Sequence, residues 1–323
     1  MKYSVAIRTL GKSPDTLRRE LESLHRQTVR PEKIVIYIAE GFPQPDFRVG
    51  MEEYVAVRKG MLAQRALRYD EVDTEYLLLL DDDVEFEADS LERLLGIMEK
   101  EGADCVACDT FENHKMSLYG KVRAALCQLV FPHFDSGRAF RIHSNGSFSY
   151  ISSPKKRYYP SMSAAGPAAL WRKSSFLKLH VEDELWLDNL GFAYGEDVLT
   201  FFKLFVSGGR LFVAFDCGIT NLDAKTSSGT YHGSAAKFRI MGKAQKILWH
   251  RMIYSLAGGK CGRFVCRLSF GFKVNWLRMV LALISISPGY RRALAEYNMG
   301  IREAEEFINS DTYRELPPYK VKL

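Results

Sequence analysis

The feature that most constrains the fold is an alternation of β-rich runs and helical segments over the first 110 residues. Strands are predicted for YSVAIRT, EKIVIYIA, EYLLLL and ADCVACDTF, and helices for SPDTLRRELESLHRQT, residues 60–69 and DSLERLLGIMEKEG. This order predicts an open, largely parallel sheet covered by helices on both faces. In such sheets ligands bind beyond the carboxyl ends of the strands. Further along, DVLTFFKLFVSGG predicts a helix and RLFVAFD a strand, whereas residues 130–165 are polar and irregular.

Several common enzyme classes lack their motifs in this sequence. The segment after the first strand, RTLGKSP, holds one glycine, so a dinucleotide-binding turn is unsupported, and no P-loop or nucleophile elbow is present. The pair Cys105 and Cys108 stands within a predicted strand, where residues three apart face opposite sides. We therefore expect reduced, structural cysteines rather than a zinc site.

The charge of the chain is unevenly distributed. Residues 224–295 hold 13 Lys/Arg and no Asp/Glu, which leaves 32 basic and 39 acidic residues elsewhere. Such a basic segment suggests an anionic partner or, alternatively, a solvated basic face. Its longest uncharged run, 279–290, is too short to span a bilayer. A helix lying on an anionic membrane surface fits better, and the alternative is a helical extension packed on the catalytic domain.

Three consecutive aspartates follow the third predicted strand. Residues two apart in an extended chain project to the same side, so Asp81 and Asp83 are expected to converge while Asp82 turns away. Two converging carboxylates suit Mg²⁺ or Mn²⁺ completed by water and phosphate oxygens. The alternative is a solvated acidic turn.

A second acidic pair, Glu196 and Asp197, begins the predicted helix EDVLTFFKLFV. Helix amino termini favour negative charge, so a capping role is available. An aspartate held there could alternatively act as a general base.

Taken in order, these segments resemble the family-2 glycosyltransferases, which share the GT-A fold. The resemblance extends from Tyr3 to about Gly233 through SVAIRTLGKSPDTLRRELESLHRQTVRPEKIVIYIAEG, RKGMLAQRALRYDEVDTEYLLLLDDDV, AAGPAALWRKSSF and YGEDVLTFFKLFVSGGRLFV. It implies transfer of a sugar, with inversion, from a nucleotide-sugar donor to a glycan or lipid-linked acceptor, as in polysaccharide biosynthesis.

The resemblance also implies roles for individual residues. Asp197 would be the catalytic base, and Mg²⁺ or Mn²⁺ would be held by Asp83 with Asp81 and His232. The floor under donor sugar and acceptor would comprise Gly166, Pro167, Ala168 and Glu196. The donor would be bound by Thr9, Glu40, Arg58, Arg65, Asp81 and Asp82. Glu40 stands where members of the family commonly carry an aspartate that reads the base.

The sequence thus predicts a GT-A catalytic domain over residues 1–233 and a basic, apolar helical extension over residues 234–323. The amino terminus lacks a signal-peptide pattern, so we expect a cytoplasmic protein, with peripheral contact at the inner face of the cell membrane. Two alternatives remain: a peripheral membrane protein on a degenerate transferase fold, and a sugar nucleotidyltransferase. No nucleic-acid-binding module accompanies the basic charge, so no nucleic-acid partner is expected.

Overall fold

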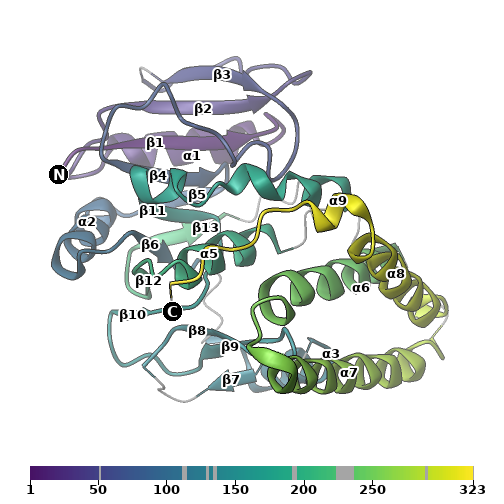
Figure 1. The fold of residues 1–323 in the computed structure, drawn as a ribbon. Helices are drawn as coiled ribbons and strands as arrows, with labels where there is room; N and C mark the ends of the chain where they lie inside the picture. The colour runs from purple at the N-terminus through teal and green to yellow at the C-terminus, as the bar shows by residue number, and fades with distance from the viewer. Residues whose placement is uncertain are drawn as a thin grey trace.

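The structure is a computed structural model that describes residues 1–50, 52–110, 115–128, 131–133, 137–190, 195–222, 236–287 and 290–322. At its centre is a sheet of eight strands in the order β10-β12-β6-β11-β4-β1-β2-β3 (Figure 1). These strands are β1 (Tyr3–Thr9), β2 (Ile34–Ala39), β3 (Glu53–Val57), β4 (Tyr76–Asp81), β6 (Cys105–Cys108), β10 (Tyr158–Pro160), β11 (Ala168–Arg172) and β12 (Leu211–Ala214).

The sheet is mostly parallel, as the sequence predicts. Strands β3, β2, β1 and β4 run parallel in succession, and β6 and β12 form a further parallel pair. The antiparallel strand β11 lies between β4 and β6, and β10 is antiparallel at the edge. The register places Arg8 beside Asp81 and Ala168 beside Leu80. The carboxyl ends of β1 and β4 therefore meet the amino end of β11.

Helices cover both faces of the sheet because alternate strand residues face opposite sides. Leu78 and Leu80 of β4 pack in the core under α1 (Pro14–His25) and α2 (Ser90–Glu101). Leu77 and Leu79 pack in a second core with α4 (Lys173–Leu177), the 3₁₀ segment η2 (Val181–Leu190) and α5 (Glu196–Val206). The same alternation places Cys105 in the core with α5 and Cys108 in the core with α1 and α2. Both thiols are free, as expected.

The predicted helix over residues 60–69 is wrong. The segment forms successive turns, and Tyr69, with a φ of 54°, interrupts any helical path. The carboxylate of Asp188 accepts hydrogen bonds from the amides of Leu62 and Ala63, both at 2.9 Å. Gln64 Nε2 donates to the Thr9 carbonyl (3.0 Å) at the end of β1. The acceptors that fix these turns, the Asp188 carboxylate and the Thr9 carbonyl, come from distant segments, so local periodicity could not reveal them.

Residues 130–165 are more ordered than the sequence suggests. Strands β7 (Phe131–His133), β8 (Phe140–Ile142) and β9 (Phe148–Ile151) form a small separate sheet, after helix α3 (Leu118–Gln128). Each strand is too short to give a clear period-2 pattern. A further two-stranded sheet pairs β5 (Val84–Phe86) with β13 (Ile219–Asn221), which brings the backbone of Leu222 to that of Asp83 (2.7 Å).

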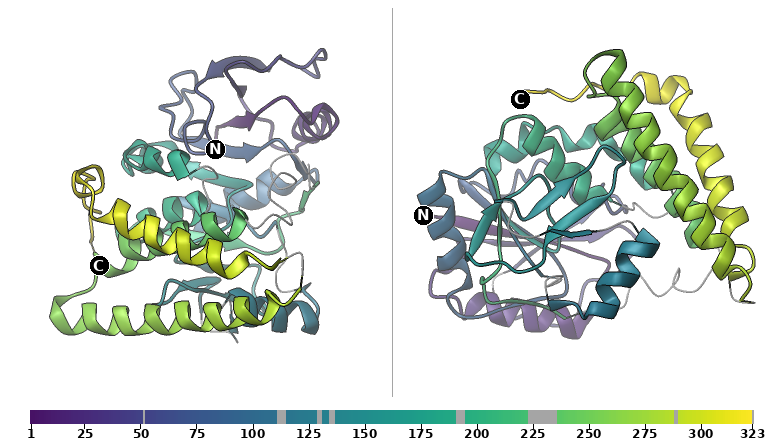
Figure 2. Two further views of the ribbon diagram at one scale, coloured as in Figure 1. Left: turned by 90° about the vertical axis from the view of Figure 1, so that its right-hand side faces the viewer. Right: turned by 90° about the horizontal axis from the view of Figure 1, so that it is seen from below.

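The carboxyl-terminal part is helical and packs on the rest of the molecule. It comprises α6 (Ala236–Trp249), the π-helical turn η3 (His250–Tyr254), α7 (Gly259–Ile284), α8 (Ala293–Ile308) and α9 (Asp311–Arg314). Helix α6 lies along α8, and α7 runs beside the small sheet and α3 (Figures 1 and 2). The buried pair between Arg251 and Glu184 (2.8 Å) joins this part to η2. Among the helices that the structure describes, none combines the length and hydrophobicity that a membrane crossing requires.

Candidate active site

Asp81, at the end of β4, is held by two arginines. Arg8 on the neighbouring strand donates from Nη2 to Asp81 Oδ2 (3.2 Å) and from Nε to Oδ1, and Arg65 Nη2 donates to Oδ1 (3.0 Å). Burial favours the neutral carboxyl, but the charges and hydrogen bonds of Arg8 and Arg65 prevail and lower the pKa of Asp81. Asp81 is therefore an ionised carboxylate that neutralises and orients two guanidinium groups.

The acidic pair at the start of α5 completes this network. Buried Glu196 accepts from Arg8 Nη1 and Arg65 Nη1, both at 3.0 Å. Arg65 Nη1 also contacts Asp197 Oδ1, and the Gly166 amide donates to Asp197 Oδ2 (3.2 Å). Asp197 remains partly accessible, with 28% of its side chain exposed. Glu196 thus serves the buried network, whereas Asp197 faces outward from it.

Gly166 lies directly against Asp197. A Cβ at this position would stand 2.0 Å from Asp197 Oδ1 and 2.6 Å from Arg65 Nη1. The Gly166 carbonyl accepts from Arg65 Nη2 (3.0 Å), and the Pro167 carbonyl accepts from the Asp81 amide (2.9 Å). The segment expected to form the floor therefore connects the acidic turn with the acidic pair, and Ala168 begins β11 behind it.

Asp82 and Asp83 occupy a turn, so the alternation expected for an extended chain ends at Asp81. Asp82 Oδ2 accepts from the Thr9 hydroxyl, and Thr9 Oγ1 accepts from the Gly11 amide (2.8 Å). Burial, aided by the charges of Asp81 and Asp83, raises the pKa of Asp82 to about 6 against the opposing Thr9 hydrogen bond. A cation at this turn would favour the ionised carboxylate.

Glu20 of α1 is a buried carboxyl behind this turn. It is fully buried, and neither of its carboxyl oxygens has a hydrogen-bond partner among the described residues. Burial, followed by the charges of Asp82, Asp83 and Asp81, raises its pKa well above the usual range, which favours the protonated carboxyl. Sequence periodicity marks Glu20 only as one more polar residue of an amphipathic helix.

The described residues contain no cluster of three or more His, Cys, Asp or Glu side chains that could hold a metal. Asp82 and Asp83 still offer the hard carboxylate oxygens that Mg²⁺ and Mn²⁺ prefer, and such sites commonly take further ligands from phosphates and water. These residues fit a cation that arrives with a diphosphate. His232, the third predicted ligand, lies outside the described residues.

The other predicted donor-binding residues are dispersed. Glu40 follows β2 and is exposed, and Arg58 is exposed after β3. Arg65 is buried in the ionic network. Thr9 is buried beneath the aspartate turn, so its hydroxyl supports Asp82.

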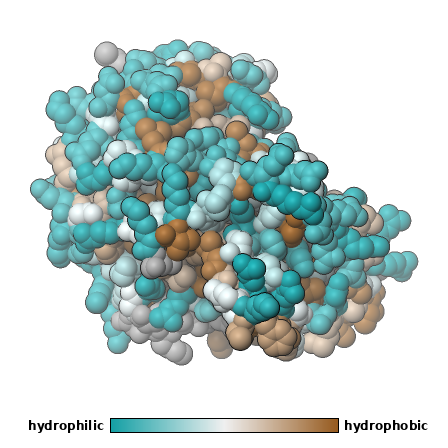
Figure 3. All heavy atoms as spheres, viewed as in Figure 1, coloured by the Kyte–Doolittle hydropathy of each residue, from teal (hydrophilic) through white to brown (hydrophobic). Residues whose placement is uncertain are grey.

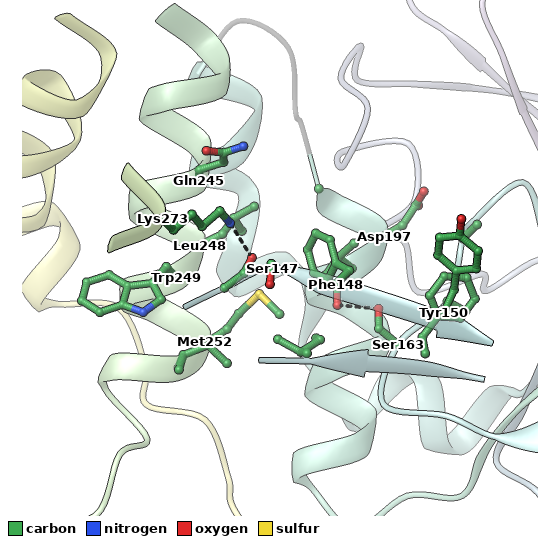
Figure 4. Close-up of a pocket in the computed structure, with 18 of the residues that line it drawn as sticks. Ser147, Phe148, Tyr150, Ser163, Asp197, Gln245, Leu248, Trp249, Met252 and Lys273 are labelled. Atoms are coloured by element: carbon green, nitrogen blue, oxygen red, sulfur yellow. Dashed lines mark hydrogen bonds between the residues drawn. The ribbon is translucent and has the colours of Figure 1, made fainter. Parts of the chain in front are cut away.

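A pocket of about 580 Å³ adjoins Asp197 (Figure 4). Its walls come from α5, the small sheet and the carboxyl-terminal helices, and they include Phe148, Tyr150, Leu248 and Trp249. This volume is within the range of small-molecule sites. The carboxylate of Asp197 therefore stands between the aspartate turn on one side and a largely apolar pocket on the other.

Sequence reasoning missed two important residues of the site. Arg8 lies within a predicted strand, and its partners Asp81 and Glu196 are 73 and 188 residues away. Lys273 belongs to the basic segment 224–295, in which the sequence singles out no individual lysine, yet it lines the pocket. One signal was available for Arg8: a charged residue inside a buried strand needs a partner.

Comparison with known families agrees with this geometry. The acidic residues lie at the carboxyl end of a central strand, where open α/β sheets bind their ligands. A family model for glycosyl transferase family 2 matches residues 4–178, more than half of the chain. The chain therefore belongs to glycosyl transferase family 2.

Other comparisons found structural but not close sequence relatives. A search of curated proteins found no match. Similar solved structures include GalNAc-T7 with UDP, GalNAc and Mn²⁺, at 16% identity and a TM-score of 0.48, covering 89% of this chain and 58% of that one. The chain thus spans somewhat over half the length of that protein. They also include S. aureus TarS 1–349 in complex with UDP, at 13% identity and a TM-score of 0.46, covering 95% of this chain and 90% of that one.

Proposed function

We propose that the protein transfers a sugar, with inversion, from a nucleoside-diphosphate donor to a hydroxyl of a glycan or lipid-linked acceptor in polysaccharide biosynthesis. The observation that carries this proposal is the placement of Asp197. It contacts Arg65 and Gly166 on the side of the aspartate turn, and it lines the pocket on its other side. A base in this position can meet an acceptor hydroxyl while the donor occupies the carboxyl end of β4.

In the proposed step, the acceptor oxygen attacks the anomeric carbon from the face opposite the diphosphate. The new bond joins the acceptor oxygen to that carbon as the carbon–oxygen bond to the diphosphate breaks. Its electron pair leaves with the diphosphate, and the acceptor proton passes to Asp197. Arg65 and the Gly166 amide hold the Asp197 carboxylate in place for this transfer.

The leaving diphosphate gains negative charge during this step. A Mg²⁺ or Mn²⁺ ion supplies charge stabilisation for such a group when bound. Asp83 would hold the ion with Asp82 beside it, while Asp81 keeps Arg8 and Arg65 oriented behind the turn. Glu40 and Arg58 stay candidates for contacts with the nucleoside because both are exposed after β2 and β3.

A first experiment measures donor binding. UDP and other nucleoside diphosphates are added with and without Mn²⁺, and thermal unfolding is followed for the full chain, Asp83→Ala and the exposed control Asp70→Ala. We expect metal-dependent stabilisation by one nucleotide, lost in Asp83→Ala and kept in the control. No response across the panel would count against the proposed donor class.

A second experiment tests the base. Asp197→Asn keeps the shape of the side chain but removes its ability to accept the acceptor proton. Loss of general-base catalysis typically costs about 10²–10⁴-fold in rate. We expect transfer to fall by this factor while nucleotide binding persists, and full turnover in this variant would remove Asp197 from the proposed role.

The proposal includes a membrane surface as a partner. On α7, exposed apolar side chains recur at helical spacing at Phe264, Leu268, Phe272 and Leu283, and Phe272 is 68% exposed. Helix α3, which lies against α7, adds exposed Leu118, Tyr119, Val122 and Leu126. Figure 3 shows apolar atoms along the lower edge of the molecule, where α7 lies in Figure 1. We call this surface the apolar face.

The basic residues near the apolar face indicate that the lipid surface would be anionic. Lys260, Arg263 and Arg267 lie on the same helix, and residues 224–295 contain no acidic residue. Basic residues near a membrane surface are attracted to anionic lipid, and apolar side chains enter the interface. An anionic bilayer is therefore the proposed partner.

Flotation with phosphatidylcholine vesicles, with and without phosphatidylserine, tests this contact. The wild type is expected to float with the anionic vesicles, and the triple variant Phe264→Ser, Leu268→Ser, Phe272→Ser to remain in solution. Val321→Ser, which changes an exposed apolar residue outside the apolar face, is the control. Wild-type protein that stays in solution with both vesicle types would exclude the membrane surface from the proposal.

A further inference from the structure

Lys273 is a buried cation in the wall of the pocket beside Asp197. It lies on the inner side of α7 and is 2% exposed. Its Nζ donates to the Gly146 carbonyl at 3.0 Å (Figure 4). A lysine ammonium carries three N–H donors. Within the described part of the chain, this carbonyl is the one acceptor that Lys273 contacts, so most of its hydrogen-bonding capacity is unused.

The pocket provides no charge that compensates this cation. Asp197 is the one acidic residue among the described lining residues, and it is already paired with Arg65. Figure 4 shows Asp197 and Lys273 on opposite sides of the pocket, with Phe148 between them. Burial lowers the pKa of Lys273 to about 8, so the group is still mostly charged at neutral pH. A buried, unpaired charge is costly unless a ligand completes it.

A second polar group, on the Asp197 side of the pocket, also lacks a partner among the described residues (Figure 4). The Tyr150 hydroxyl is buried and makes no hydrogen bond with the described residues, and Tyr150 is 4% exposed. Most other lining side chains are apolar, including Phe148, Leu248 and Met252. Pockets of this kind use a few placed polar groups to select a ligand and an apolar wall to contact its body.

The position of Lys273 is fixed by several elements. Gly146, whose φ of 68° suits glycine, supplies the carbonyl from the turn between β8 and β9. Trp249 of α6 donates to the Ser144 carbonyl (2.9 Å) in the same turn and stacks on Phe270 of α7, with ring centroids 4.2 Å apart. The ammonium group is thus held by packing between the turn, α6 and α7.

We propose that this pocket binds the acceptor and that Lys273 recognises an anionic group, a carboxylate or a phosphate, on that acceptor. The inference rests on the proposed function, because it takes Asp197 as the base that meets the acceptor hydroxyl. The anionic group and the reacting hydroxyl then lie at opposite ends of the pocket, and Tyr150 offers a hydrogen-bond donor at the end occupied by Asp197 (Figure 4). Charge-assisted hydrogen bonds of this kind are short and strong, which makes the anion a determinant of specificity.

Matched glycosides test the proposal by binding to the full chain. The probes are 4-nitrophenyl β-glucoside, the corresponding glucuronide and the glucoside 6-phosphate, with the same three compounds in the galacto series. Dissociation constants are measured for the wild type, Lys273→Met and Lys260→Met. Lys260 is an exposed lysine on the same helix and therefore a matched control.

We expect at least one anionic probe to bind the wild type about tenfold or more tightly than its neutral counterpart. The ratio of the dissociation constants of the neutral and anionic probes should fall to about one in Lys273→Met and persist in Lys260→Met. Comparison of the glucuronide with the phosphate identifies which anion is preferred. A wild type that shows no preference for any anionic probe would overturn the proposal, whether or not the variant folds. Preference retained in Lys273→Met would also overturn it.

Nucleotide binding separates this inference from the proposed function. UDP with Mn²⁺ is titrated into the same wild-type preparation. Nucleotide binding without anion preference would contradict only the role of Lys273. Anion preference without binding of any nucleoside diphosphate would support the pocket and count against the proposed donor class.

Discussion

Replacing Lys273 by methionine is predicted to stabilise the folded protein at neutral pH. Methionine has a similar length and no charge, so it can occupy the same apolar wall without the cost of a buried ammonium. The fall of the Lys273 pKa from 10.5 to about 8 corresponds to about 3 kcal/mol of unfolding free energy. The variant also loses the hydrogen bond to the Gly146 carbonyl, a loss of about 1 kcal/mol. The expected net gain at pH 7 is about 2 kcal/mol.

The pH dependence of this gain follows from the same pKa. Between about pH 8 and pH 10.5 the unfolded chain keeps the lysine proton, whereas the folded protein loses it. The contribution of Lys273 to the free energy of unfolding of the wild type therefore becomes less unfavourable as the pH rises across that interval. The advantage of Lys273→Met should shrink as the pH increases from 8 to 10.

Urea unfolding at pH 7, 8, 9 and 10 measures this difference. Wild type, Lys273→Met and Lys260→Met are compared at each pH, so that other titrating groups cancel. The exposed control should remain within about 0.5 kcal/mol of the wild type. A variant that is less stable than the wild type at pH 7, or a difference that does not change with pH, would refute the account of Lys273 as an uncompensated buried charge.

Three further substitutions test other parts of the site. Gly166→Ala places a methyl group 2.0 Å from a carboxylate oxygen, and we expect transfer to fall about 100-fold, whereas Gly96→Ala, with nothing within 4 Å, should leave transfer unchanged in the same assay. Glu20→Gln removes a buried carboxyl whose pKa is raised; because the unfolded chain releases this proton at a lower pH than the folded protein does, the gain in melting temperature should be larger at pH 8 than at pH 5. Arg251→Ala leaves the fully buried Glu184 without its closest cation, so chemical unfolding should show a loss of about 3 kcal/mol, and an unchanged stability would contradict this account.

The alternation of strands and helices was readable from the sequence because it depends on local hydrophobic periodicity. Helices α1, α2 and α5 and strands β1, β2, β4, β6 and β12 lie where apolar residues recur with the expected spacing. The same reasoning placed the three aspartates at the end of β4 and the acidic pair at the start of α5, but it expected an extended chain where Asp82 and Asp83 form a turn. It failed for residues 60–69, where the segment instead donates hydrogen bonds to the distant Asp188 carboxylate and Thr9 carbonyl.

The insertion of β11 between β4 and β6 was not readable from the sequence. A buried strand has the same apolar pattern whether its neighbours run parallel or antiparallel to it. This placement matters because it brings Gly166 and Pro167 to the carboxyl end of β4. The candidate site therefore depends on a topological feature that no local segment encodes.

The sequence by itself determined the class of fold, the acidic residues of the site and the basic carboxyl-terminal helices. Only the tertiary structure decided that Arg8 and Arg65 neutralise Asp81 and Glu196, and that Lys273 faces the pocket beside Asp197. The physical reason is the range of the interactions involved. Helix and strand patterns arise between residues a few positions apart, whereas a buried charge selects its partner according to which distant segments the folded sheet brings together.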